Sequence, residues 1–139
     1  MKQFPYTIEP SRDRNFPDRR RPWIPISLIK GYRRIATRAL IDSGADTIVI
    51  NAEFGKQLGI DLDKCSRALT GGIVGEPVTT YVAEIDIEIA NFPNSQKTVK
   101  VEFIKSKNVP ILLGQHGFFD NFKVTFERFN NFFEVDLKP

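Results

Sequence analysis

The sequence predicts an all-β protein, and two features of its 139 residues support this. Its apolar stretches are short, and several alternate with polar residues, as in a strand with one buried face. Glycine, proline and asparagine separate these stretches at close intervals, a pattern typical of the turns in a barrel or sandwich. The predicted strands are residues 4–8, 23–29, 35–41, 47–50, 81–89, 98–104, 111–113, 124–128 and 132–137.

Residues 1–22 are predicted to form an extended arm that precedes a domain of residues 23–139. Pro5, Pro10, Pro17 and Pro22 deny this segment a regular helix, so we expect a single short strand near residues 4–8. The arm is also rich in arginine, and a basic run can hold nucleic acid by neutralising phosphates. Acidic residues interrupt the run and no nucleic-acid motif accompanies it, so nucleic acid is not the expected partner.

The next elements lead to an acidic residue. Apolar residues alternate in 23–29, and a turn at 30–33 joins this strand to the strand 35–41, which ends at Asp42. The β-branched run at 47–50 predicts another strand. Asn51 is expected to cap a short helix over 52–58, and Gly59 to end it. Residues 61–70 are polar and are predicted to form a loop.

The second half of the chain contains the clearest strand pattern. Every second residue from Tyr81 to Ile89 is apolar, and 98–104 is the expected partner strand. A short buried strand at 111–113, a helical turn at 117–122 and a hairpin around Asn130 and Asn131 complete the prediction. The phenylalanines between residues 118 and 133 are expected to fill the core and an interface.

The segment Asp42-Ser43-Gly44 is the best candidate for chemistry. A carboxylate at the end of a buried strand is costly unless it is hydrogen-bonded or shared. Gly44 allows a tight turn that brings its amide close to the carboxylate, and the Ser43 hydroxyl can brace the loop. An ordinary Asp-Ser-Gly turn between two strands is the alternative interpretation.

Three motifs in order resemble the retropepsin family of aspartic proteases, and the resemblance runs from about residue 22 to 122. Asp42-Ser43-Gly44-Ala45-Asp46 is similar to the family's Asp-Thr/Ser-Gly-Ala signature. Gly71-Gly72-Ile73-Val74-Gly75 resembles its flap, and Leu112-Leu113-Gly114 resembles its apolar-apolar-Gly motif. The chain also resembles bacterial retropepsin-like proteins, which have longer, Phe-rich C-termini. The resemblance implies a closed β-barrel or sandwich with one or two short helices and a flap hairpin.

The resemblance also implies an activity and its residues. Asp42 would be the catalytic carboxylate, supported by Ser43 and Gly44. Because the chain has one such motif, the second carboxylate would come from a second copy in a homodimer. Two such acids hydrolyse a peptide bond with an activated water. No metal or cofactor is expected. The residues that would bind an extended peptide are Ala45, Asp46, Gly71, Gly72, Ile73, Val74 and Gly75.

The sequence departs from the viral pattern after Gly114. Viral enzymes carry arginine where this chain has Gln115, so the support of the loop is expected to be weaker or rebuilt. This departure keeps an alternative open, a catalytically silent retropepsin-like module that binds peptides or mediates assembly. For the segment 71–75, the alternative to a flap is a plain hairpin turn.

Composition and single residues indicate where in the cell the protein is expected to be found. Hydrophobic residues make up 41% of the chain and charged residues 27%, and no apolar run approaches the ~20 residues of a membrane helix. With one cysteine, Cys65, and no signal-like N-terminus, the chain is expected to be cytoplasmic and not bound to a membrane. Cys65 and the only histidine, His116, are given structural or surface roles.

Overall fold

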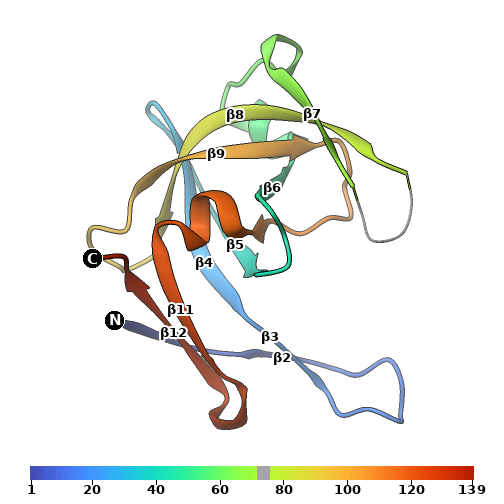
Figure 1. Cartoon of the computed structure of the whole chain (residues 1–139), viewed down its shortest axis with the longest axis vertical. Helices are drawn as coiled ribbons and strands as arrows, with labels where there is room; N and C mark the ends of the chain where they lie inside the picture. Colours follow the sequence, from blue (N-terminus) through green and yellow to red (C-terminus); the bar gives the residue numbers. More distant parts are fainter. Residues whose placement is uncertain (72–75) are drawn as a thin grey trace.

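A closed β-barrel forms the main body of the protein in a computed structural model that describes residues 1–71 and 76–139 (Figure 1). The barrel strands follow the order β4–β5–β10–β6–β9–β8, and a second pairing of β8 with β4 closes the ring. The all-β prediction is confirmed. The barrel strands are β4 (Trp23–Lys30), β5 (Arg33–Ile41), β6 (Ile48–Asn51), β8 (Val78–Ile89), β9 (Lys97–Ile104) and β10 (Leu112–Leu113).

The barrel interior is filled by the apolar residues whose alternation predicted the strands. Ile85, Ile87 and Ile89 on β8 are almost fully buried, as the period-two pattern requires. Val101 and Phe103 on β9 face the same interior, because they pair directly with Ala83 and Tyr81 of the alternating β8 face. The opposite face of β9 is therefore available for a site.

In residues 1–71 and 76–139, four short helical segments accompany the strands. They are α1 (Ala52–Gln57), η1 (Leu62–Lys64), η2 (Gln115–Phe119) and η3 (Arg128–Asn130). Asn51 caps α1 as predicted, since its side chain accepts a hydrogen bond of 2.9 Å from the backbone N–H of Glu53. Gly59 follows the helix with a φ of +79°, which favours glycine. The predicted turn at 117–122 begins earlier, at Gln115, and Phe122 already belongs to the next strand.

The prediction of a loop over residues 61–70 is wrong. This stretch contains η1 and the strand β7 (Ser66–Thr70), which pairs antiparallel with β8 at the edge of the sheet. Leu69 on β7 is exposed, so the strand has no buried apolar face that a sequence pattern could reveal. Backbone pairing with β8 holds this strand in place.

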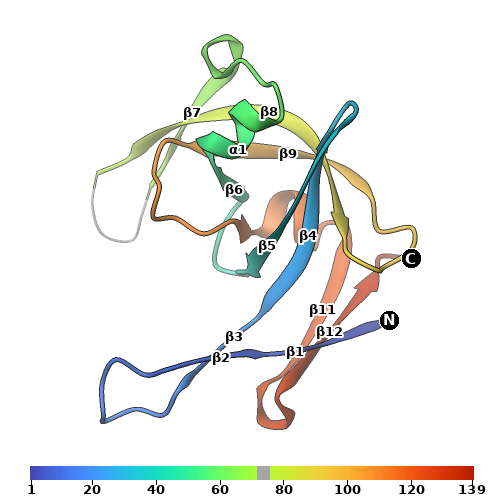
Figure 2. The ribbon, with the colours of Figure 1, turned by 180° about the vertical axis from the view of Figure 1, so that it is seen from behind.

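The two ends of the chain form a small sheet beside the barrel (Figure 2). In this sheet β12 (Phe132–Leu137) lies between β1 (Lys2–Pro5) and β11 (Phe122–Glu127), and both pairings are antiparallel. The hairpin predicted around Asn130 and Asn131 is present. Asn131 adopts a left-handed φ of 62° at the turn, a conformation that asparagine tolerates well.

The segment before Trp23 is extended but has more strands than predicted. After β1 it forms a hairpin from β2 (Thr7–Glu9) and β3 (Arg19–Arg21), which projects away from the barrel in both views (Figures 1 and 2). Phe4 and Tyr6 are buried against Phe133, with ring centroids 5.5 and 5.3 Å away. The domain boundary at residue 23 remains a prediction.

Within the described ranges 1–71 and 76–139, no helix has the length and apolar character needed to span a membrane.

Candidate active site

Asp42 stands where three strands meet. It directly follows β5, which runs parallel to β10, and β10 also pairs with β6 on its other side. The backbone N–H of Asp42 donates a hydrogen bond of 3.1 Å to the carbonyl of Leu113. The loop 42–47 therefore connects β5 with β6, and β10, which pairs with both strands, contacts the loop through its backbone.

The loop turns back on the Asp42 side chain. The backbone N–H of Gly44 donates to Oδ1 of Asp42 at 2.9 Å, and the N–H of Ala45 donates to the Asp42 carbonyl at 3.1 Å. Asp42 is half-buried, whereas Ser43 and Gly44 are exposed. A backbone amide directed at a carboxylate oxygen fixes the orientation of the side chain. This is the close approach that glycine at position 44 was expected to permit.

The segment after β10 supports the loop through its backbone. The N–H of Gln115 donates to the carbonyl of Ala45 at 2.9 Å, and the N–H of His116 donates to the carbonyl of Asp46 at 2.8 Å. The side chain of Gln115 donates from Nε2 to the carbonyl of Ser43 at 3.0 Å. The support expected from position 115 is thus rebuilt as neutral hydrogen bonds to the loop backbone.

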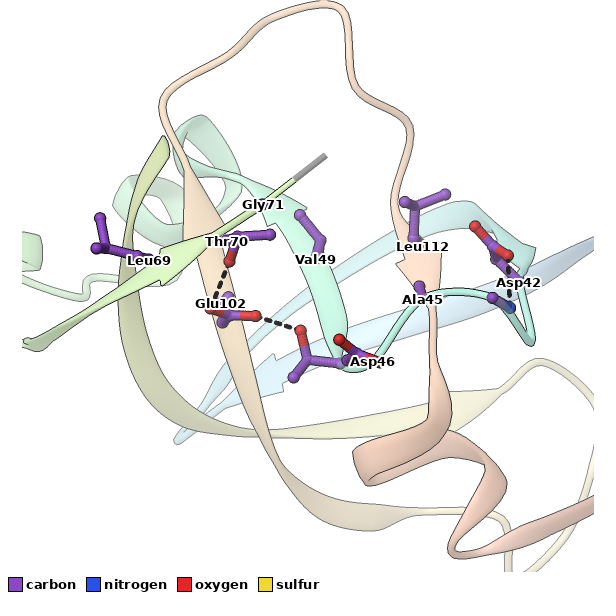
Figure 3. Close-up of a pocket in the computed structure, with 11 residues that line it drawn as sticks. Asp42, Ala45, Asp46, Val49, Leu69, Thr70, Gly71, Glu102 and Leu112 are labelled. Atoms are coloured by element: carbon purple, nitrogen blue, oxygen red, sulfur yellow. Dashed lines mark hydrogen bonds between the residues drawn. The ribbon is translucent and has the colours of Figure 1, made fainter. Parts of the chain in front are cut away.

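A cavity of about 420 Å³ opens beside this loop (Figure 3). Of the residues predicted to form the site, Asp42, Gly44, Ala45, Asp46 and Gly71 line it, and Ser43 does not. The predicted flap residues 72–75 lie outside the described residues. The remaining lining residues are Thr47, Val49, Leu69, Thr70, Glu102 and Leu112.

Strand register explains why these side chains share one wall. Leu112 pairs with Val49, and Val49 pairs with Glu102, so the three side chains lie on the same face of the sheet. That face is opposite to the one that carries Val101 and Phe103 into the barrel interior. The cavity therefore rests on the outer surface of the barrel, covered by the loop on one side and by β7 on the other.

Glu102 is the site residue that sequence reasoning missed. The residue is only 9% exposed, and its carboxylate accepts hydrogen bonds from the hydroxyls of Thr47, Thr70 and Thr80. Burial raises the pKa of Glu102, but the hydrogen bonds from Thr47, Thr80 and Thr70 together outweigh burial and leave the pKa below its usual value. One signal in the sequence could have identified it: Glu102 is the single acidic residue in the predicted strand 98–104, which is rich in β-branched residues.

The other residues considered for chemistry lie apart from the cavity wall. His116 is exposed, with Nδ1 3.9 Å from the Asp120 carboxylate. The Cys65 thiol is near the carbonyl of Asp61, at 3.4 Å. In the described part of the chain, no three His, Cys, Asp or Glu side chains gather in a way that would hold a metal ion.

Comparison with known proteins connects this geometry to a family. The family model described as aspartyl protease matches residues 28–116, which is more than half of the chain and includes the whole loop 42–47 and Gly114. This chain belongs to the aspartyl protease family. No curated protein sequence matches it.

A solved structure shows which branch of aspartyl proteases the fold resembles. The crystal structure of a retropepsin-like aspartic protease from Rickettsia conorii matches with a TM-score of 0.64, covering 96% of this chain and 89% of that chain. Sequence identity is 16%, so this likeness is one of fold. The family match and the shared fold confirm the prediction that this chain is a member of the aspartyl protease family with a retropepsin-like fold.

Proposed function

We propose that this aspartyl protease is an endopeptidase in which two copies of Asp42, one from each chain of a homodimer, activate a water molecule. The observation that supports this most directly is the placement of Asp42. Its carboxylate is fixed by the Gly44 N–H at 2.9 Å and lines an open cavity. A rigidly held, accessible carboxylate is what general-base catalysis on water requires.

One chain supplies one such carboxylate, and the chemistry needs two. Two close carboxyl groups share a proton, because both cannot ionise easily when they are adjacent. The ionised acid takes a proton from water while the protonated acid donates toward the carbonyl oxygen of the scissile peptide. The symmetric source of the second acid is another copy of the same loop, related by a two-fold axis.

The cavity suits an extended peptide. Ala45 and Asp46 line one side, and Gly71 at the end of β7 lines the other, so a peptide strand between them would have backbone groups on both sides. Val49 and Leu112 provide apolar contact on the floor. The role of residues 72–75 as a flap stays a prediction from the sequence.

The test is the substitution Asp42→Asn, measured by cleavage of an unfolded protein substrate. Asparagine keeps the shape and cannot act as the base, so cleavage is expected to fall by more than about 100-fold. Asp63→Asn is the control, because Asp63 is an exposed carboxylate outside the cavity. Equal cleavage by wild type and Asp42→Asn rules out this mechanism. Peptide binding by a wild type that cleaves nothing would indicate the silent module instead.

A further inference from the structure

One buried carboxylate in the cavity wall connects segments that are far apart in the sequence. Glu102 on β9 accepts hydrogen bonds at Oε1 from Thr70 on β7 and from Thr80 on β8, each at 2.7 Å. Its other oxygen, Oε2, accepts from the hydroxyl of Thr47 at the end of the catalytic loop. Figure 3 shows Glu102 and Thr70 joined across the cavity wall.

The arrangement of donors fits an ionised carboxylate. Each threonine hydroxyl has one proton, and the shortest hydrogen bond of each hydroxyl is the one to Glu102. A protonated acid would add a fourth donor to the group, and one hydroxyl would have to turn away. Thr80 is fully buried, so its alternative to Glu102 is the longer contact of 3.4 Å to the carbonyl of Ala68. The three contacts therefore hold together as a unit.

The position of this unit gives it a role beyond stability. Thr47 is five residues from Asp42, in the same loop, and its carbonyl lies against Gly114. Thr70 is next to Gly71 in the opposite wall of the cavity. Apart from the Glu102 carboxylate, no hydrogen bond between described side chains connects the loop 42–47 with the β7–β8 hairpin.

We propose that Glu102 is a positioning residue that couples the catalytic loop to the β7–β8 hairpin and so fixes the width of the substrate cavity. This inference rests on the proposed peptidase function for its effect on cleavage. Glu102 acts through Thr47 and Thr70 and has no part in the chemistry of peptide hydrolysis. Loss of the Glu102 carboxylate is expected to disturb the position of the bound substrate more than the chemical step at Asp42.

The test begins with Glu102→Gln, which keeps the size of the side chain but places an amide donor among three hydroxyl donors. We expect kcat/KM to fall about tenfold, mainly through an increase in KM, since the misplaced wall weakens substrate binding. Thr47→Val, which removes only the donor on the loop, is expected to give the same split between KM and kcat. It also replaces Glu102→Gln as the test variant if that protein does not fold.

Thr98→Val is the matched control. Thr98 donates to the Asp86 carboxylate at 2.6 Å, so this variant removes a threonine–carboxylate hydrogen bond between the same two strands, β8 and β9. Thr98 and Asp86 are not among the lining residues of the cavity. Its kcat and KM are expected to equal those of wild type. Equal kinetic constants in all four proteins overturn the proposal.

Amide hydrogen exchange separates this inference from the peptidase function. In Glu102→Gln, exchange is expected to increase together in 42–47 and 66–70, while α1 and β12 keep the protection of wild type. A uniform increase that includes α1 and β12 would make Glu102 a stability residue only and overturns the coupling, as does unchanged exchange in both segments. If wild type cleaves no substrate, the peptidase proposal fails, yet this exchange pattern still decides whether Glu102 couples the two segments.

Discussion

A Cβ atom on Gly114 would lie 2.2 Å from the carbonyl oxygen of Thr47. The same atom would lie 2.5 Å from the carbonyl oxygen of Ala45, so the loop 42–47 rests directly on a glycine backbone. No side chain fits at these distances, because both neighbours are backbone atoms of a hydrogen-bonded loop. Glycine at the end of the apolar-apolar-Gly motif is thus required because there is no room for a side chain, whatever its backbone dihedral angles.

Gly114→Ala is therefore expected to lower the free energy of unfolding by about 3 kcal/mol or more, because loop and strand must move apart. Chemical denaturation measures this. Gly71→Ala is the control, since a Cβ on Gly71 meets no atom of the described residues within 4 Å, and its effect should stay within about 0.5 kcal/mol. Similar unfolding free energies for the two variants would show that the loop does not need the close approach.

Specific activity is expected to fall on dilution, because each chain carries half of the proposed site. Below the dissociation constant of the dimer, mass action converts the active pair into inactive single chains. The measurement is initial cleavage rate per chain over a series of enzyme concentrations, with sedimentation velocity at the same concentrations. Constant activity per chain in samples that sediment as monomers would exclude the homodimer as the active species.

The stabilising effect of Glu102 is expected to disappear in acid. Because the pKa of Glu102 in the folded protein lies below the ordinary glutamate value of 4.5, its contribution is complete above that pH and is lost as the pH falls through the folded pKa. At neutral pH, Glu102→Gln should lower the free energy of unfolding by about 2 kcal/mol. The difference from wild type should shrink below about pH 4.5. Asp42 and Asp46 line the same cavity, but they are present in both proteins. Their contributions therefore largely cancel in the difference between Glu102→Gln and wild type.

Urea denaturation at several pH values measures this difference, and Thr98→Val gives the comparison. The hydrogen bond from Thr98, followed by one from Gln96, lowers the pKa of Asp86 from its ordinary value of 3.8. The effect of Thr98→Val should therefore begin to shrink below about pH 3.8, whereas that of Glu102→Gln begins to shrink below about pH 4.5. A difference between Glu102→Gln and wild type that stays the same from neutral pH to pH ~3 contradicts the assignment.

Phe4→Ala is expected to show that the first strand belongs to the fold. Phe4 is 6% exposed and stacks on the buried Phe133, so its truncation should lower the free energy of unfolding by about 3 to 5 kcal/mol. Phe16 lies in the same N-terminal segment but is 68% exposed, and Phe16→Ala should change stability by less than about 0.5 kcal/mol. Thermal or urea unfolding of both variants measures this. Equal, small effects would support an arm that is independent of the domain.

The sequence was informative wherever apolar alternation and turn residues determine the structure. The strand ending at Asp42, the capped helix after Asn51 and the alternating face from Ile85 to Ile89 could all be predicted, because burial of one strand face leaves a local pattern. The family resemblance pointed to the loop that lines the cavity, although the catalytic role of Asp42 itself awaits the substitution test.

Other features could not be read from local pattern. Alternation places Glu102 opposite Val101 and Phe103, on a face that would be solvent-exposed in an isolated sheet. It is buried because Thr47 and Thr70 approach it from distant parts of the chain, and single-strand periodicity carries no information about such neighbours. The strand β7 was missed for a related reason, since its pairing with β8 depends on backbone hydrogen bonds and leaves Leu69 exposed.

The pairing of β1 with β12 also determines the order in which the protein can be completed during synthesis. Lys2 pairs with Val135, and Phe4 with Phe133, so β1 must wait until the residues of β12 have emerged from the ribosome. The barrel strands β4 to β10 are all translated before that point and can close without it. The sheet of β1, β12 and β11 therefore forms after the barrel strands have been made, and a chain halted before residue 132 would leave the apolar side chain of Phe4 without its partner.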